Sequence, residues 1–416
     1  MSKNIKIGFI GLGKLGLDCA EVFAQHYPVM GFDVDQRTSE SVTVLNSPQT
    51  LVDFCDWIFI AVPTPHDHGY DGSVPSSHLE PRDFGHDAVI TALHYIRDYA
   101  KTAKNVVLIS TVLPGTTRKN LVQHLGDHHS HRLFYNPYLI AMGSVKWDMV
   151  NPEMVIIGTD TADMGSTRQL IELYQPLMAN DPRYVSGTWE ECESIKIFYN
   201  TFISAKIGLV NMIQDFAQKI GNINVDVVTD ALANSNIRIM SSKYMTAGLG
   251  DSGACHPRDN IALRWLAQEY NLGYDLFDTV MLAREQQARN LAEFLLDLAK
   301  KHNLPIVIHG KAYKPDVPYC IGSYSTLISC YIKSQGYPVV FVDPLADDPT
   351  DVVNDVVDPA VILLAHNRNI TYGYTQQHQP DRDYFEFRPG SIIVDPWRRY
   401  PNKPEFTVIH YGNTRK

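Results

Sequence analysis

A glycine-rich loop followed by a cysteine is the stretch of this sequence best suited to covalent chemistry. Residues 248–253 carry three glycines in six positions, and Cys255 follows them. Pro257 and the apolar residues after it have helical spacing, so the cysteine precedes a helix N-terminus, where backbone N–H groups and the helix dipole favour a thiolate. Asp259 lies in the first turn of that helix. We interpret Cys255 as a nucleophile and Asp259 as its neighbour on the same bound group; a buried structural cysteine is the alternative.

A long helical pattern after Trp189 places further polar groups on one face. Glu193, Lys196 and Asn200 follow one another at spacings of three and four residues, so their side chains share one side of a helix. An ammonium group and an amide one turn apart can donate to a developing oxyanion. A solvated lysine that only pairs with Glu193 is the alternative, and the sequence leaves both open.

The beginning of the chain has the pattern of a dinucleotide site. A buried-strand pattern at residues 5–10 ends in glycines at Gly11 to Gly16 and passes into a helix over residues 17–25. In that context the glycines let the backbone approach a pyrophosphate on the helix N-terminus. Asp33 ends the next strand, at the offset of an acid that binds a ribose 2′-hydroxyl, which predicts NAD. Arg37 nearby leaves NADP open.

Polar residues also follow two other predicted strands. Thr64 comes after the strand at residues 57–62, and Ser110 and Thr111 follow the strand at residues 106–109. The carboxyl ends of parallel strands border the ligand crevice, so these hydroxyls are site candidates. Serine and threonine in turns also serve as local caps, which is the alternative.

The order of the patterns predicts an α/β protein with two Rossmann-like, doubly wound domains joined by a central helical segment with a long helix. Residues 211–302 are mostly helical, apart from the cysteine loop. Strand patterns then return at residues 304–309, 338–343, 360–365 and 391–395. We expect domains at residues 1–185, 186–302 and 303–416.

Composition narrows the class of protein further. The 36 Lys and Arg residues stand against 46 Asp and Glu residues, a net charge of −10, which argues against a nucleic-acid surface. Six scattered cysteines without CxxC spacing indicate thiols of a reducing compartment. The histidines at residues 124–131 lack partners at metal-ligand spacing. The first strand is too short for a signal or membrane segment. We predict a cytoplasmic protein without a metal.

Taken together, the motifs resemble those of the UDP-glucose/GDP-mannose dehydrogenase family over nearly the whole chain. They are, in order, Gly11 to Gly16, Val62 to Pro65, Ser110 to Thr117, Asn136-Pro137 with Asn151 to Glu153, Lys196 with Asn200, Arg238-Ile239, the cysteine loop to Asp259, and Gly310 to Pro315. The resemblance implies NAD-dependent, four-electron oxidation of a nucleotide-sugar C6 alcohol to the uronic acid, in polysaccharide biosynthesis. UDP-glucose is the expected substrate, and UDP-N-acetylhexosamines and GDP-mannose are alternatives.

The resemblance also implies roles for single residues. Cys255 would trap the aldehyde as a thiohemiacetal that becomes a thioester, with Lys196, Asn200, Asp259 and Thr111 as the other catalytic residues. The implied cofactor positions are Gly11, Leu12, Gly13, Lys14, Leu15, Gly16, Asp33, Val62, Pro63, Thr64, Ser110, Thr111 and Lys314. The implied substrate positions are Tyr138, Leu139, Lys196, Asn200, Arg238, Tyr244, Gly248, Gly250, Tyr313 and Lys314. Arg238 would enter the sugar pocket of a neighbouring subunit, so the family implies at least a homodimer.

Several positions depart from the family pattern, most of them at the sugar or nicotinamide ends of the implied site. They are Tyr138 for glutamate, Asp251-Ser252 for Phe-Gly, Arg258 for lysine, Ile321 for arginine, and Asp395-Pro-Trp-Arg398 for Asp-Gly-Arg. The departures bear on which substrate is used more than on the reaction class.

Two functions of other classes compete with this interpretation. A two-electron β-hydroxyacid dehydrogenase would use the lysine and asparagine but needs neither Cys255 nor a second α/β domain. A catalytically silent nucleotide-binding protein would explain Tyr138 and Ile321, although it leaves the joint presence of Cys255, Lys196, Asn200 and Asp259 without a reason.

Overall fold

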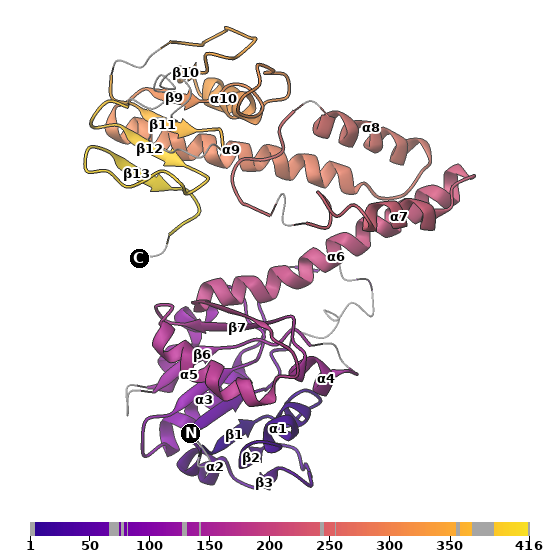
Figure 1. The fold of residues 1–416 in the computed structure, drawn as a ribbon, viewed down its shortest axis with the longest axis vertical. Helices are drawn as coiled ribbons and strands as arrows, with labels where there is room; N and C mark the ends of the chain where they lie inside the picture. Colours follow the sequence, from indigo (N-terminus) through magenta and orange to yellow (C-terminus); the bar gives the residue numbers. More distant parts are fainter. Residues whose placement is uncertain are drawn as a thin grey trace. The chain divides into compact units, whose positions relative to one another are not determined.

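The computed structural model describes two compact units, residues 1–208 and residues 209–416, each with its own sheet and core (Figure 1). The boundary falls within the long helix α6, Trp189–Ile220. The residues that the structure describes are 5–65, 75, 79–80, 82–126, 131–140, 143–241, 245–253, 255–354, 358–367 and 387–414. No helix among them combines the length and apolar character needed to cross a membrane.

In the part of the chain that the structure describes, the N-terminal unit is built on a sheet of eight strands. The strands are β1 Ile7–Ile10, β2 Val29–Phe32, β3 Thr43–Leu45, β4 Trp57–Ile60, β5 Asn105–Leu108, β6 Arg132–Tyr135, β7 Met154–Thr159 and β8 Arg183–Thr188, in the spatial order β3-β2-β1-β4-β5-β6-β7-β8. Neighbouring strands are parallel except β6 and β7, which meet antiparallel where Tyr135 faces Gly158. The central strands are short, apolar runs because helices cover both faces of the sheet.

Helices on the two faces enclose two separate cores. They are α1 Gly16–Ala24, α2 Pro48–Phe54, α3 Asp87–Tyr99, α4 Val145–Val150 and α5 Met164–Tyr174, with short turns η1 Thr117–Leu121, η2 Val122–Leu125 and η4 Gln175–Leu177. Phe59 of β4 packs with α1, α4 and α5, while its neighbours Ile58 and Ile60 pack with α2 and α3. This alternation follows from the two-residue period of a strand.

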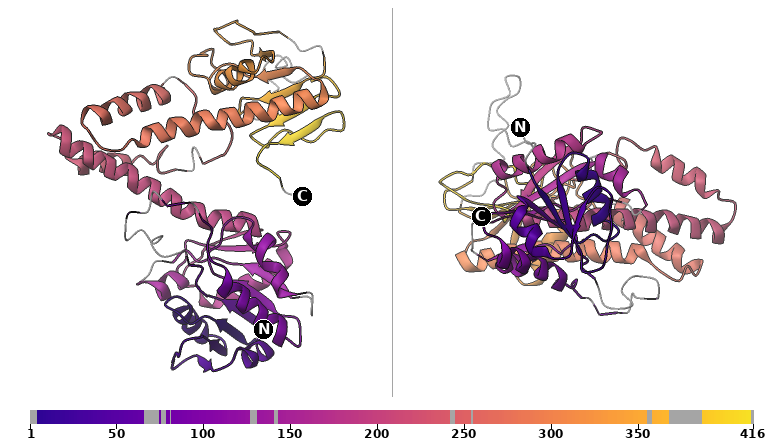
Figure 2. Two further views of the ribbon diagram at one scale, coloured as in Figure 1. Left: turned by 180° about the vertical axis from the view of Figure 1, so that it is seen from behind. Right: turned by 90° about the horizontal axis from the view of Figure 1, so that it is seen from below.

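The C-terminal unit holds a second, fully parallel sheet. Its strands are β9 Ile306–His309, β10 Val339–Val342, β11 Val361–Leu364, β12 Ile392–Asp395 and β13 Thr407–His410, in the order β10-β9-β11-β12-β13. The helices of this unit are α7 Val225–Ala233, α8 Cys255–Glu269, α9 Leu276–His302 and α10 Tyr324–Ser334. Helix α9 lies along one face of the sheet, where Leu291 and Leu295 pack with Ile308 and Leu363 (Figure 2).

The same kind of glycine turn follows the strand β1 in one unit and the strand β9 in the other. Gly11 after β1 and Gly310 after β9 have φ angles of +96° and +107°. The acid that ends the neighbouring strand accepts a backbone N–H from each turn: Asp33 from Leu12, and Asp343 from both Lys311 and Ala312. The predicted fold class, with two Rossmann-like sheets joined by helices, is confirmed.

Candidate active site

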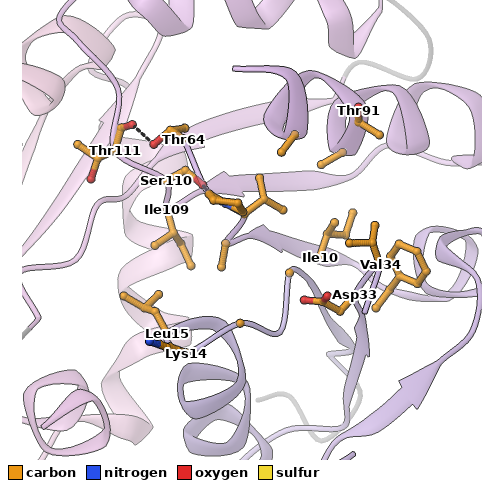
Figure 3. Close-up of a pocket in the computed structure, with 18 of the residues that line it drawn as sticks. Ile10, Lys14, Leu15, Asp33, Val34, Thr64, Thr91, Ile109, Ser110 and Thr111 are labelled. Atoms are coloured by element: carbon orange, nitrogen blue, oxygen red, sulfur yellow. Dashed lines mark hydrogen bonds between the residues drawn. The ribbon is translucent and has the colours of Figure 1, made fainter. Parts of the chain in front are cut away.

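A cavity of about 690 Å³ lies at the carboxyl ends of β1, β2, β4 and β5 (Figure 3). Its floor is the glycine turn after β1. A Cβ at Gly11 would lie 2.5 Å from the carbonyl oxygen of Ala61, and one at Gly16 would lie 2.1 Å from the carbonyl oxygen of Gly11. Only glycine therefore allows the turn to pack this closely, which leaves the N-terminus of α1 accessible for a phosphate.

Asp33 borders the same cavity and is held in place by the backbone (Figure 3). Its carboxylate accepts hydrogen bonds from Leu12 N at 2.6 Å and Asp35 N at 2.8 Å. Arg37 Nε lies 3.8 Å from one carboxylate oxygen. A carboxylate has about four acceptor positions, so Asp33 can still accept from a ribose hydroxyl. The turn and the acid together fit a dinucleotide.

The predicted hydroxyl residues link the loops after β4 and β5. Thr64 Oγ1 donates to the carbonyl oxygen of Thr111 at 2.7 Å, and Ser110 Oγ donates to that of Val62 at 2.6 Å. These two hydrogen bonds span 47 and 48 residues of the chain, so they tie the two loops together and are not local caps. Both loops still line the cavity, which also contacts Gly11, Gly13, Lys14, Leu15, Val62, Pro63 and Thr111.

Lys196 of α6 reaches this cavity as well. Its Nζ donates to the carbonyl oxygen of Tyr138 at 2.7 Å, and burial lowers the pKa of the ammonium group. Asn200, one turn further along α6, is exposed. A half-buried amine at the edge of a cofactor cavity is suited to stabilise a developing negative charge.

Glu193 has a structural role that the sequence analysis missed. Its side chain is fully buried and accepts hydrogen bonds from Gly115 N at 2.5 Å and Thr117 N at 2.8 Å. Burial raises the pKa of this carboxyl group. The solvated pair of Glu193 with Lys196 is therefore wrong, because each has a different partner. The sequence held one signal for this role. A helical turn after Pro114 begins with backbone N–H groups that need an acceptor, and a carboxylate can supply it.

Tyr138 directs its side chain into the protein core. Its hydroxyl lies 2.6 Å from the hydroxyl of Tyr174, which donates to Asn136 Oδ1 at 2.5 Å. Burial raises the pKa of Tyr138. The next residue, Leu139, packs against the core on the other face of the sheet. At the cavity edge, the carbonyl oxygen of Tyr138 is thus the group that engages Lys196.

The cysteine and its neighbouring acid lie in the C-terminal unit. Cys255 is exposed and is the first residue of α8, close to the predicted position. Asp259 is exposed in the first turns of α8, and its carboxylate is 2.8 Å from Arg258 Nη2. Arg238 and Ile321 have exposed side chains. Tyr244 lies outside the described residues, as do His128 and His129 of the histidine run.

A second cavity, of about 140 Å³, lies in the C-terminal unit. Gly250, Tyr313 and Lys314 line it, and the Lys314 ammonium lies 5.3 Å from the centre of the Tyr313 ring. The structure therefore groups Lys196, Tyr138 and Thr111 around the cavity of one unit and groups Gly250, Tyr313 and Lys314 around that of the other.

Comparison with known protein families identifies the family of this chain. The NAD binding domain of the UDP-glucose/GDP-mannose dehydrogenase family matches residues 35–178, and the central domain of that family matches residues 190–285. The chain belongs to the UDP-glucose/GDP-mannose dehydrogenase family. These are nucleotide-sugar dehydrogenases, and the cofactor of this family member is NAD, in agreement with the glycine turn and Asp33.

Individual relatives are distant. The UDP-glucose 6-dehydrogenase of Rhizobium meliloti is 27% identical over 300 residues, which are 71% of this chain and 65% of that protein. The UDP-glucose 6-dehydrogenase AglM of Haloferax volcanii is 23% identical over 376 residues, 83% of this chain and 84% of that protein. The match thus spans slightly less than two thirds of the bacterial relative.

Among solved structures, a ternary complex of GDP-mannose dehydrogenase from Pseudomonas aeruginosa is similar to this chain with a TM-score of 0.78. The two proteins are 19% identical, and the superposition covers 97% of this chain and 99% of that one. At this identity the likeness concerns the fold.

Proposed function

We propose that this protein is an NAD-dependent nucleotide-sugar 6-dehydrogenase that oxidises UDP-glucose to UDP-glucuronate. The observation that carries the proposal is an exposed cysteine at the first position of a helix, behind a glycine-rich loop, in a chain of this family. A helix N-terminus favours the thiolate that would attack an aldehyde.

Two oxidations at C6 make up the proposed reaction. Bound NAD supplies the oxidising power by accepting one hydride in each of them. The glycine turn from Gly11 to Gly16 holds the pyrophosphate, and Asp33 holds the ribose. In the first oxidation Lys196 and Asn200 donate hydrogen bonds to the C6 alkoxide, while its proton leaves through Asp259.

Cys255 makes the second oxidation possible. Its sulfur bonds to C6 of the aldehyde, and the carbonyl oxygen takes up a proton to complete the thiohemiacetal. Loss of the C6 hydride and the hydroxyl proton leaves a thioester on Cys255. Water, bound by Thr111 and deprotonated by Asp259, then breaks the C–S bond, which releases the carboxylate and restores the thiol.

The three-part division at residues 1–185, 186–302 and 303–416 remains part of the proposal. We assign NAD binding to the first segment, the cysteine loop and self-association to the second, and the nucleotide end of the substrate to the third. The cavity lined by Tyr313 and Lys314 supports the last assignment. All six cysteines are free thiols, which supports a cytoplasmic location.

A substrate panel tests the proposal. UDP-glucose, UDP-N-acetylhexosamines and GDP-mannose are each mixed with NAD, and NADH and sugar acid are both quantified. We expect two NADH per acid, with UDP-glucose used best. One NADH per sugar would indicate a two-electron dehydrogenase, and preference for another sugar would replace UDP-glucose within the same reaction class.

Substitution of the cysteine tests the covalent mechanism. Cys255→Ala is expected to abolish acid formation and leave binding of the nucleotide sugar nearly unchanged, because the thiol acts after the substrate is bound. Cys330→Ala, at the other exposed cysteine, is the control for general effects of thiol removal. Acid formation by Cys255→Ala at the wild-type rate would exclude the thioester and favour the two-electron alternative.

A further inference from the structure

We propose that Asp251 and Arg284 are positioning residues: their ion pair, together with contacts of Ser252 and Trp397, fixes the cysteine loop within the C-terminal unit and so sets the reach of the Cys255 thiol. The inference rests on the proposed function for its catalytic consequence. The structural part of the inference, that these contacts hold the loop in place, does not depend on which substrate the enzyme uses.

The glycines of the loop lie against aromatic rings. A Cβ at Gly248 would lie 2.0 Å from the ring of Trp397, and one at Gly250 would lie 2.3 Å from the ring of Tyr324. Any side chain at these two positions would displace a ring that is itself anchored, since Trp397 Nε1 donates to the carbonyl oxygen of Leu364 at 3.0 Å. The backbone of the loop therefore packs directly against the rings of Trp397 and Tyr324.

Asp251 adds a charged contact to this packing. Its carboxylate lies 2.5 Å from Arg284 Nε, and Arg284 Nη2 also donates to the carbonyl oxygen of Asp251 at 3.2 Å. The Arg284 side chain is only 10% exposed, and its guanidinium group lies 5.2 Å from the centre of the Tyr324 ring. A guanidinium shielded from water holds a carboxylate more firmly than a surface lysine would.

The neighbouring residues complete the clamp. Ser252 Oγ accepts a hydrogen bond from Tyr324 N at 3.0 Å, which caps the first residue of α10 from outside the helix. Gly253 N donates to the carbonyl oxygen of Gly322 at 2.9 Å. On the other side of the loop, Arg398 Nη2 donates to the carbonyl oxygen of Ala247 at 2.6 Å. Both ends of the loop are thus tied to the same unit.

Two of the segments that depart from the family pattern, Asp251-Ser252 and residues 395–398, contribute to this clamp. Asp251, Ser252, Trp397 and Arg398 all contact either the loop or the surface that holds it. Because the carboxylate of Asp251 is engaged by Arg284, its role is to hold the loop and not to activate water.

A double-mutant cycle tests the inference. Asp251→Asn, Arg284→Gln and the double variant are compared in kcat, in KM for NAD, and in hydrogen exchange of residues 247–253. We expect each single change to lower kcat about tenfold and the double change to cost no more than either, because each single change already removes the shared ion pair. KM for NAD should stay constant, since the cofactor cavity lies in the other unit.

Lys333→Gln is the matched control, because it removes the ion pair of Lys333 with Asp351 at the far end of α10. It should change neither kcat nor exchange of the loop. The exchanged-charge variant Asp251→Arg with Arg284→Asp should recover part of kcat. If Asp251→Asn alone lost activity together with a limb of the pH profile, while Arg284→Gln kept full kcat, Asp251 would be a base and the inference wrong.

Unchanged loop exchange in both single variants would also overturn it. That outcome is distinct from failure of the proposed function, which would show as acid formation by Cys255→Ala and leaves the exchange measurement untouched.

Discussion

Lys196 is the point at which α6 meets the cofactor cavity, and its charge should control the alkaline side of the activity profile. Burial lowers the pKa of its ammonium group, so the proton is lost at a lower pH than the ordinary value of about 10.4. In the reaction that we propose, the protonated form donates to the oxyanion. Activity should therefore fall as pH rises through the lowered pKa, and kcat measured from pH 7 to 10.5 should show this limb.

Lys196→Arg is the informative variant, because a guanidinium group stays charged throughout this pH range. It should remove this alkaline limb even though the changed geometry lowers kcat. Lys196→Ala should lose about 10²- to 10³-fold in kcat, the usual loss for an oxyanion donor. An unchanged alkaline limb in Lys196→Arg would assign the titration to another group.

Tyr138 leads to a prediction about the slow step. The family has glutamate here, and loss of a carboxylate that activates water slows hydrolysis by about 10²- to 10⁴-fold. We expect a burst of two NADH per site, a slow steady state, and a sugar-nucleotide thioester on Cys255 in quenched enzyme by mass spectrometry. A linear trace without the adduct would show that Asp259 replaces the glutamate fully or that an earlier step is slow.

Tyr138→Phe removes the hydroxyl group and keeps the aromatic ring, so it tests the hydroxyl alone. That hydroxyl is hydrogen-bonded to Tyr174 in the core, so its removal should cost about 1 kcal/mol of stability and leave the slow phase unchanged. A changed slow phase would place the hydroxyl in the hydrolysis step.

Between elements, Glu193 connects α6 to the loop that carries Thr111. Glu193→Ala would leave two buried N–H groups, those of Gly115 and Thr117, without their acceptor, at about 1–3 kcal/mol each. We expect a clearly lower urea midpoint. Glu172→Ala, which removes an exposed pair with Arg168 in the same unit, should cost about 0.5 kcal/mol. Equal losses in the two variants would contradict this role.

The elements that the sequence predicted and those that it missed differ in burial. The central strands, such as β1, β4 and β11, are fully buried apolar runs and were predicted nearly residue by residue. Three strands at sheet edges, β3, β8 and β13, were not. They are only partly buried, and so they carry no continuous apolar signal. The edge strand β10 is mostly buried, and it was predicted.

The same distinction holds for the site. The glycine turn, Asp33 and the cysteine before its helix follow from local patterns in the sequence. The partners of Glu193, Lys196 and Asp251 are 33 or more residues away in the chain, so no spacing rule could pair them.

For the molecule as a whole, exposed apolar side chains on the helices support the proposed homodimer. The large ones on α6, α7 and α8 are Phe198, Phe202, Ile203, Ile207, Leu209, Ile220, Val227, Leu232, Ile261 and Trp265. Exposed apolar side chains on helices are typical of interaction surfaces. We expect the wild-type protein to be at least a dimer by light scattering after gel filtration.

Ile261 and Trp265, four residues apart on α8, allow a direct test of the dimer. The double change to serine should lower the measured mass toward that of a monomer of 46.9 kDa. Phe54→Ser, at an exposed apolar residue on α2, should leave the mass unchanged. A wild-type monomer, or a double variant that stays dimeric, would exclude α8 from the interface.

The glycine turn that occurs in both units bears on the order in which cofactor and sugar bind and leave. In the N-terminal unit α1 begins at Gly16, directly after the turn, whereas in the C-terminal unit α10 begins only at Tyr324, far from Gly310. Asp343 is buried and accepts hydrogen bonds from Lys311, Ala312 and Leu345. Of the two turns, the first alone offers a dinucleotide a helix N-terminus and an available acid. In the reaction that we propose, a single cofactor site would serve both oxidations, so NADH would depart and fresh NAD would bind while the half-oxidised sugar stays on the enzyme. The cofactor would bind and leave rapidly and repeatedly, and the sugar would remain bound.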